Sequence, residues 1–138
     1  MDDNWQHGTL GDLVNSGKDI VLRDFWRIDP EKVKDGSFDS LTALARENGI
    51  KLALWIAPGF YNQYEDHKEF AELVLDFYRR YGFELFKIDG VSFPSYRSEQ
   101  NFEEMLRTIS LQSGRRIFFN LDVTAGMRFS KRILFPSR

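Results

Sequence analysis

From Lys51 onward, short apolar runs alternate with longer amphipathic stretches along the chain. The apolar runs predict strands at residues 51–58 (KLALWIAP), 83–89 (FELFKID) and 117–123 (IFFNLDV). In parallel sheets the strands are covered on both faces, so their sequences are nearly continuous apolar runs, and helices connect one strand to the next. The alternation therefore predicts βα units that build a parallel sheet.

Between and before these runs, apolar residues recur at helical spacing. They predict helices at about 38–48, at 65–81 and from Ser98 to just before Gly114. Gly49, Gly82 and Gly114 follow the predicted helix ends, where glycine commonly caps a helix. The side chains expected to face inward are Leu41, Leu44, Ala45, Phe70, Leu73, Val74, Phe77, Tyr78, Phe102, Met105, Leu106 and Ile109.

Equivalent points recur at regular intervals, because Trp55, Asp89 and Asp122 all fall near predicted strand ends, 34 and 33 residues apart. Each interval fits one βα unit. An eight-stranded barrel needs about 250 residues. We therefore expect residues 1–138 to form an α/β fold, a partial (β/α)8 TIM barrel with about half of the strands. A doubly wound sheet is the competing architecture, but its glycine-rich phosphate loop is missing.

The last ten residues, 129–138 (FSKRILFPSR), fit neither a clear helix nor the βα pattern. We expect them to be an atypical tail that results from truncation or a frame shift.

Composition narrows the possible functions. With 42% hydrophobic and 15% aromatic residues the chain has ample material for a packed core. Nineteen basic against 21 acidic residues leave no positive field for nucleic acid, and no apolar run approaches the roughly 20 residues of a membrane span. The absence of cysteine and the wide separation of His7 and His67 argue against a metal site other than one built from carboxylates.

In parallel α/β folds the active site forms at the carboxyl ends of the strands. Lys87 and Asp89 stand two apart there, so their side chains leave the strand on the same face. A buried lysine beside it would keep Asp89 ionised. A structural ion pair, or an aspartate that caps a helix after Gly90, explains the same spacing equally well.

Other polar or aromatic positions also admit two interpretations. Trp55 can stack on a sugar ring or belong to the core. Asn120 and Asp122 can be site residues or turn formers. Asp2 and Asp3, taken alone, are typical of a solvated terminus.

Four segments, MDDNWQHG, WRIDPEKVKDG, GIKLALWIAPG and FELFKIDG, resemble in this order successive segments of the α-galactosidase (melibiase) families 27 and 36 of retaining glycoside hydrolases. The resemblance covers about residues 2–128. It implies a TIM barrel that hydrolyses α-galactosides by double displacement, with a carbohydrate substrate and no metal or organic cofactor. A different donor sugar on the same fold stays open.

The resemblance also implies roles for individual residues. Asp89 is similar to the nucleophile and Lys87 to the lysine that binds substrate hydroxyls. Asp2 and Asp3 resemble the pair that binds the galactose hydroxyls farthest from the reaction centre. The remaining positions implied to line or rim the pocket are Trp5, Trp55, Asp122 and Arg128.

The chain departs from the family pattern in three places. Asn4 replaces a glycine, Ala57 stands where family 36 often carries glutamate, and the acid/base carboxylate would come from a strand after Arg138. The alternative is therefore a non-catalytic fragment or sugar-binding remnant. Because a half barrel exposes sheet edges, we also expect self-association.

Overall fold

The computed structural model describes residues 4–9, 12, 21–59 and 62–123. A short helix α2 (Leu22–Phe25), a 3-10 turn η1 (Lys34–Gly36) and helix α3 (Asp39–Glu47) come first. Strand and helix then alternate as β1 (Ala53–Ile56), α4 (His67–Tyr81), β2 (Leu85–Ile88), α5 (Tyr96–Gln112) and β3 (Phe118–Leu121). The predicted order of helices and strands is confirmed.

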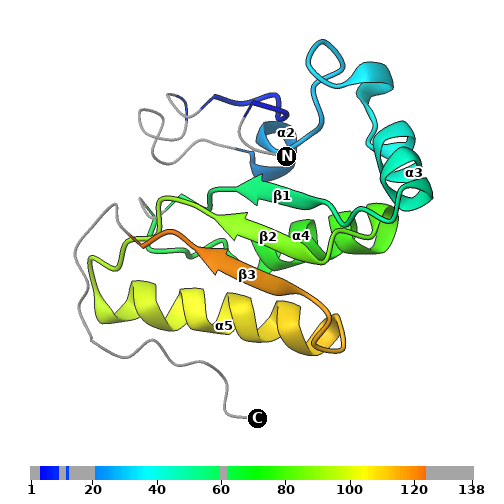
Figure 1. The fold of residues 1–138 in the computed structure, drawn as a ribbon. Coiled ribbons are helices and arrows are strands. Elements are labelled where there is room, and N and C mark those ends of the chain that lie inside the picture. The colour runs from blue at the N-terminus through cyan, green and yellow to red at the C-terminus, as the bar shows by residue number, and fades with distance from the viewer. Residues whose placement is uncertain (1–3, 10–11, 13–20, 60–61, 124–138) are drawn as a thin grey trace.

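The three strands form one parallel sheet in the order β1-β2-β3 (Figure 1). Trp55 pairs with Lys87, and Lys87 pairs with Asn120, so equivalent positions of the three βα units lie side by side. The mixed α/β class with a parallel sheet is confirmed. A closed barrel is not formed by the described residues, which contribute three strands.

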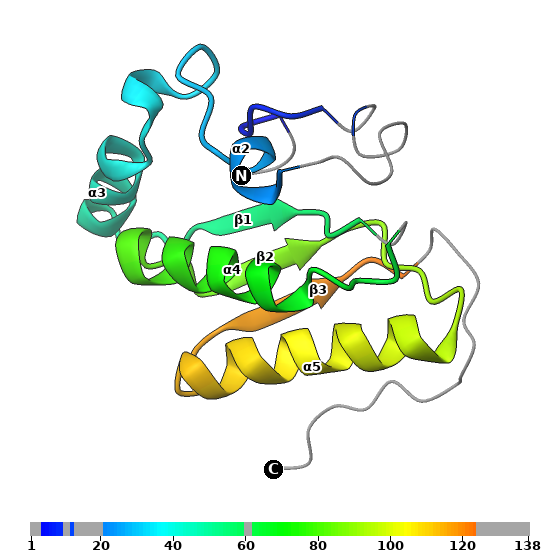
Figure 2. The same cartoon turned by 180° about the vertical axis from the view of Figure 1, so that it is seen from behind.

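Helices α4 and α5 connect successive strands and pack against each other on one side of the sheet (Figure 2). The strand residues that point toward them, Leu54, Ile56, Phe86 and Ile88, are completely buried. Leu85 and Phe118 point the other way and are 42% and 66% exposed. One face of the sheet is thus covered and the other is largely open.

Beside β1, an aromatic cluster joins the N-terminal segment to the helices. The ring of Trp5 lies 5.7 Å from Trp26 and 5.2 Å edge-on from Phe77, between ring centroids. Edge-to-face and tilted contacts at this range are favourable beyond simple burial. The cluster therefore fixes residues 5 and 26 against α4. No described helix is both long and apolar enough to cross a bilayer.

The predicted start of the third helix is wrong. Ser98 is the third residue of α5, and Ser95 is the residue that caps it. The Ser95 hydroxyl accepts the Ser98 N–H, and the Ser98 hydroxyl accepts the Ser95 N–H, both at 3.1 Å. This reciprocal cap gives hydrogen-bond partners to two backbone N–H groups that have none within the first turn of the helix.

One inward-facing prediction also fails, because Leu44 on α3 is 58% exposed. Helix α3 packs mainly through Ala45, which is buried. The predicted glycine cap of α4 is confirmed, since Gly82 has a φ of 75° and its N–H bonds the Tyr78 carbonyl.

Candidate active site at the strand ends

Asp89 directly follows β2, the central strand of the sheet. Its backbone N–H donates to the Ile56 carbonyl at 2.9 Å, which extends the ladder by one residue. Its half-buried carboxylate accepts two hydrogen bonds: Oδ2 from Trp55 Nε1 at 3.0 Å and Oδ1 from the Gly90 N–H at 2.7 Å. Both carboxylate oxygens are therefore fixed in orientation.

Local sequence explains this geometry. Gly90 has a φ of 65°, a conformation that glycine adopts without strain, so the chain turns away immediately after Asp89. The turn brings the Gly90 N–H onto the carboxylate. The interpretation of Asp89 as a helix cap is wrong, because Ser95 caps the next helix.

Lys87 lies two residues before Asp89 on the same face of β2, as its spacing predicts. It is half-buried and stands in register between Trp55 and Asn120. The predicted Lys87–Asp89 ion pair is not formed between these two described residues, since the Asp89 carboxylate is bonded to Trp55 and Gly90 instead. The structure thus brings an ammonium, a carboxylate and an indole to adjoining positions of two neighbouring strands.

The two tryptophans form a chain of hydrogen bonds that ends on Asp89. Trp5 Nε1 donates to the Trp55 carbonyl at 2.9 Å, and Trp55 Nε1 donates to Asp89. Both rings are core side chains here, with 1% and 2% of their surface exposed. The sequence did not predict these two hydrogen bonds, because the first joins residues that are 50 positions apart and the second joins residues that are 34 positions apart. Their predicted place in a sugar pocket stays a prediction.

Asp122 occupies the equivalent end of β3. Its N–H donates to the Ile88 carbonyl at 2.8 Å, and its carbonyl accepts the Val91 N–H at 3.1 Å. Since neighbouring strands run about 4.8 Å apart, the side chains of Asp89 and Asp122 leave from adjacent backbones. Asp122 is half-buried rather than enclosed.

The remaining predicted site residues, Asp2, Asp3 and Arg128, lie outside the described residues, as does the tail 129–138. Among the described residues, no cluster of three or more histidine, aspartate or glutamate side chains is arranged to hold a metal ion.

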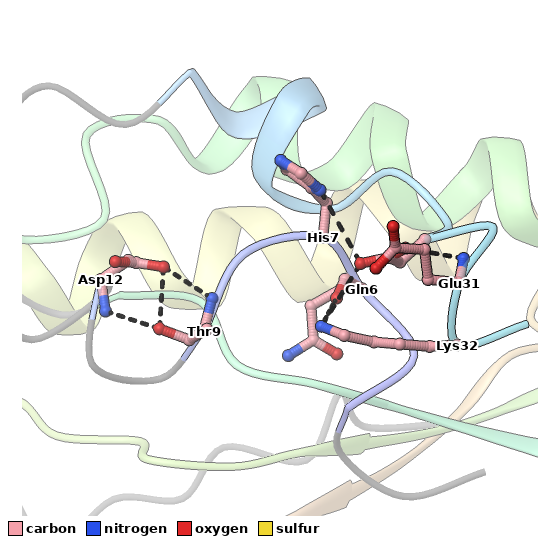
Figure 3. Close-up of polar contacts among 7 residues, drawn as sticks. Gln6, His7, Thr9, Asp12, Glu31 and Lys32 are labelled. Atoms are coloured by element: carbon pink, nitrogen blue, oxygen red, sulfur yellow. Dashed lines mark hydrogen bonds and ion pairs between the residues drawn. The ribbon is translucent and has the colours of Figure 1, made fainter.

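A polar cluster around Asp29, which the sequence did not single out, holds the segment that carries Trp5 (Figure 3). The Asp29 carboxylate accepts the Glu31 N–H at 2.9 Å and lies 3.5 Å from the Lys32 ammonium. The Glu31 hydrogen bond lowers the pKa of Asp29 with help from Lys32, while burial acts in the opposite direction. Asp29 is therefore held in its ionised form.

Two further bonds connect this cluster to the chain of tryptophans. The Asp29 N–H donates to the Trp5 carbonyl at 3.1 Å. Lys32 Nζ donates to the Gln6 carbonyl at 2.9 Å (Figure 3). The backbone on both sides of Trp5 is thereby fixed. The signal in sequence was Asp29 followed by Lys32 three residues later, a spacing typical of a local ion pair.

No family model, curated protein or solved structure matches the chain. The residues at the strand ends and the segments that resemble the α-galactosidase families are therefore the features that bear on function.

Proposed function

We propose that this chain represents part of a retaining glycoside hydrolase that acts on α-galactosides, with Asp89 as the nucleophile. The observation that carries the proposal is the Asp89 carboxylate, which stands at the end of the central strand and is oriented by Trp55 and Gly90. The four ordered sequence segments that resemble the α-galactosidase families support it independently. The full barrel and the sugar pocket belong to the same proposal.

The chemistry requires a carboxylate of fixed orientation. In the first step, an Asp89 oxygen bonds to the anomeric carbon as the glycosidic bond breaks, and the leaving oxygen takes a proton from an acid. In the second step, water attacks the same carbon, releases Asp89 and returns a proton to that group. Two hydrogen bonds hold Asp89 in place and leave lone pairs on both of its oxygens for the reaction.

The mechanism also needs a second carboxyl group about 5 to 5.5 Å from the nucleophile. Asp122 is the candidate within the described residues, because it ends the strand next to Asp89. Lys87, in this proposal, binds substrate hydroxyls and supports the negative charge of Asp89.

The second candidate is a fragment or sugar-binding remnant without catalysis. The observation that favours it is that both Asp89 oxygens already accept protein hydrogen bonds, an arrangement that also stabilises a strand end. Binding without turnover would distinguish the two candidates.

The decisive experiment is hydrolysis of a chromogenic α-galactoside by the purified chain, with a β-galactoside as the substrate control. We expect Asp89→Asn to reduce the rate by at least about a thousandfold, because it removes the nucleophile. Asp24→Asn, an exposed aspartate on α2, is the matched control and should retain full activity.

Asp122→Asn tests the second carboxylate in the same assay and should reduce the rate strongly if it is the acid/base group. Full activity in folded Asp89→Asn would contradict the proposed nucleophile. Galactose binding by an inactive, folded chain would support the remnant instead. A folded chain with neither binding nor turnover would reject both candidates.

A further inference from the structure

A pocket of about 370 Å³ lies between α2 and the last turns of α4. Its floor consists of apolar and aromatic side chains that are themselves buried: Trp26, Leu73, Phe77 and Tyr81. Its rim carries the charged side chains Arg23, Arg27, Asp76 and Arg80. An apolar floor with a few charged groups around it is the usual composition of a small-molecule site.

The charge of the rim is predominantly positive, with three guanidinium groups against one carboxylate. Asp76 is shared, since it lies 3.1 Å from Arg23 and 3.5 Å from Arg79, which is not part of the lining. Asp76 is therefore already neutralised by its neighbours and does not cancel the charge of Arg27 or Arg80.

These two arginines are available to a ligand. No described carboxylate forms an ion pair with Arg27. Arg80 has its guanidinium carbon 4.9 Å from the centre of the Tyr81 ring, a contact that orients it, and its only described ion pair is a long one of 3.9 Å to exposed Asp39. Exposed pairs of that length contribute little.

We propose that this pocket binds a small organic anion, with its carboxylate or phosphate group held by Arg27 and Arg80 and its apolar body over the aromatic floor. The planar fork of arginine matches both oxyanions in a bidentate geometry. The volume lies in the range of ordinary ligand pockets and fits a molecule of modest size.

This site opens between α2 and α4, and neither Asp89 nor any other strand-end residue lines it. The nearest link is Trp26 in the floor, whose ring lies 6.0 Å from that of Trp55. The inference therefore does not rest on the proposed hydrolase activity, and either can fail without the other.

The test uses the 138-residue chain with phenyl phosphate as the probe. Binding is measured by calorimetry and by tryptophan fluorescence, to which Trp26 in the floor contributes. Saturable binding of phenyl phosphate is expected, with weaker binding of inorganic phosphate and none of benzyl alcohol, which has the ring without the charge. Binding should weaken as salt is added, because the contact is electrostatic. If inorganic phosphate bound as tightly as phenyl phosphate, the aromatic floor would have no role in holding the ligand.

Arg27→Gln and Arg80→Gln should each weaken phenyl phosphate binding by about tenfold or more, because each removes a charge-assisted contact. Arg107→Gln, an exposed arginine on α5, is the matched control and should bind as the unaltered chain does. Both pocket arginines are exposed, and circular dichroism checks that the variants fold.

Should a glutamine variant fail to fold, Arg27→Lys and Arg80→Lys replace it and should show intermediate weakening, since the charge remains without the fork. Equal losses in Arg107→Gln, unchanged binding in both pocket variants, or no saturable binding by the folded chain would each overturn the proposal.

Discussion

The two faces of the sheet are built from the same strands but differ in their surroundings along β2 and β3. Phe86 and Phe118 illustrate this, because the first is fully buried beneath α4 and α5 and the second is 66% exposed. The buried face stabilises the fold through apolar contact. The open face carries Lys87, Asn120 and, at its end, Asp89, so it provides the polar groups that chemistry requires.

Stability and candidate function are thus separated within β2 and β3. Successive residues point to opposite faces, so four residues supply both a core contact and a site contact. Substitutions on the two faces should consequently have different effects, from large losses of stability to changes in association alone.

The largest effect should come from Phe86→Ala. Removing a fully buried phenyl ring between β2 and the helices should cost about 3–5 kcal/mol of the free energy of unfolding. Phe118→Ala, its counterpart on the open face, should change this free energy by no more than about 0.5 kcal/mol. Urea denaturation measures both, and similar losses would mean that the open face is covered in solution.

Trp55→Phe should have the next largest effect. It keeps a buried ring but removes the N–H that donates to Asp89, and hydrogen bonds to charged groups contribute about 1.5–3 kcal/mol. Trp26→Phe is the matched control, because the structure gives the Trp26 indole no hydrogen bond to any described residue. A double-mutant cycle with Asp89→Asn should show coupling for Trp55 and none for Trp26.

Ser95→Ala tests the helix that covers the buried face. The change removes the bond from the Ser98 N–H to the Ser95 hydroxyl, together with the 2.6 Å bond from that hydroxyl to Gln63, and should cost about 1 kcal/mol in the same denaturation experiment. Ser110→Ala, within the same helix, should leave stability nearly unchanged. Equal effects of the two substitutions would argue that the cap at Ser95 does not form in solution.

Phe118→Lys should scarcely alter stability but should reduce self-association, because it places a charge on the open face beside the outer edge of β3. Sedimentation velocity over a range of concentrations measures this. Gln100→Lys, an exposed change on α5 that likewise adds one positive charge, is the control. A strictly monomeric unaltered chain with a cooperative thermal transition would contradict the predicted association.

Sequence reasoning predicted the elements well where the signal is local. The apolar runs and the helical spacing of Phe70, Leu73, Val74 and Phe77 located β1, β2, β3 and α4 correctly within a few residues. The glycine at 82 marked a helix end because its backbone conformation is one that other residues rarely adopt. The start of α5 was misplaced because Ser95 and Ser98 are equally good caps in sequence, and geometry alone distinguishes them.

Features that join distant residues could not be predicted. The spacing of Lys87 and Asp89 correctly gave their common face, but the donor to Asp89 comes from Trp55 on the neighbouring strand. The pocket rim brings Arg27 together with Arg80, 53 positions later. Such pairs depend on how elements pack, which periodicity along one chain does not encode.

The hydrogen bond from Trp5 to the Trp55 carbonyl has a consequence for assembly. The Ile56 carbonyl faces β2, so the adjacent Trp55 carbonyl faces outward, and an indole already occupies it. In the described part of the chain β3 pairs with β2 alone, so the outer edge of β3 offers backbone groups to a further strand. The occupied Trp55 carbonyl makes the β1 edge the poorer of the two for pairing, so association through β3 would favour closed two-fold pairs over growing fibrils.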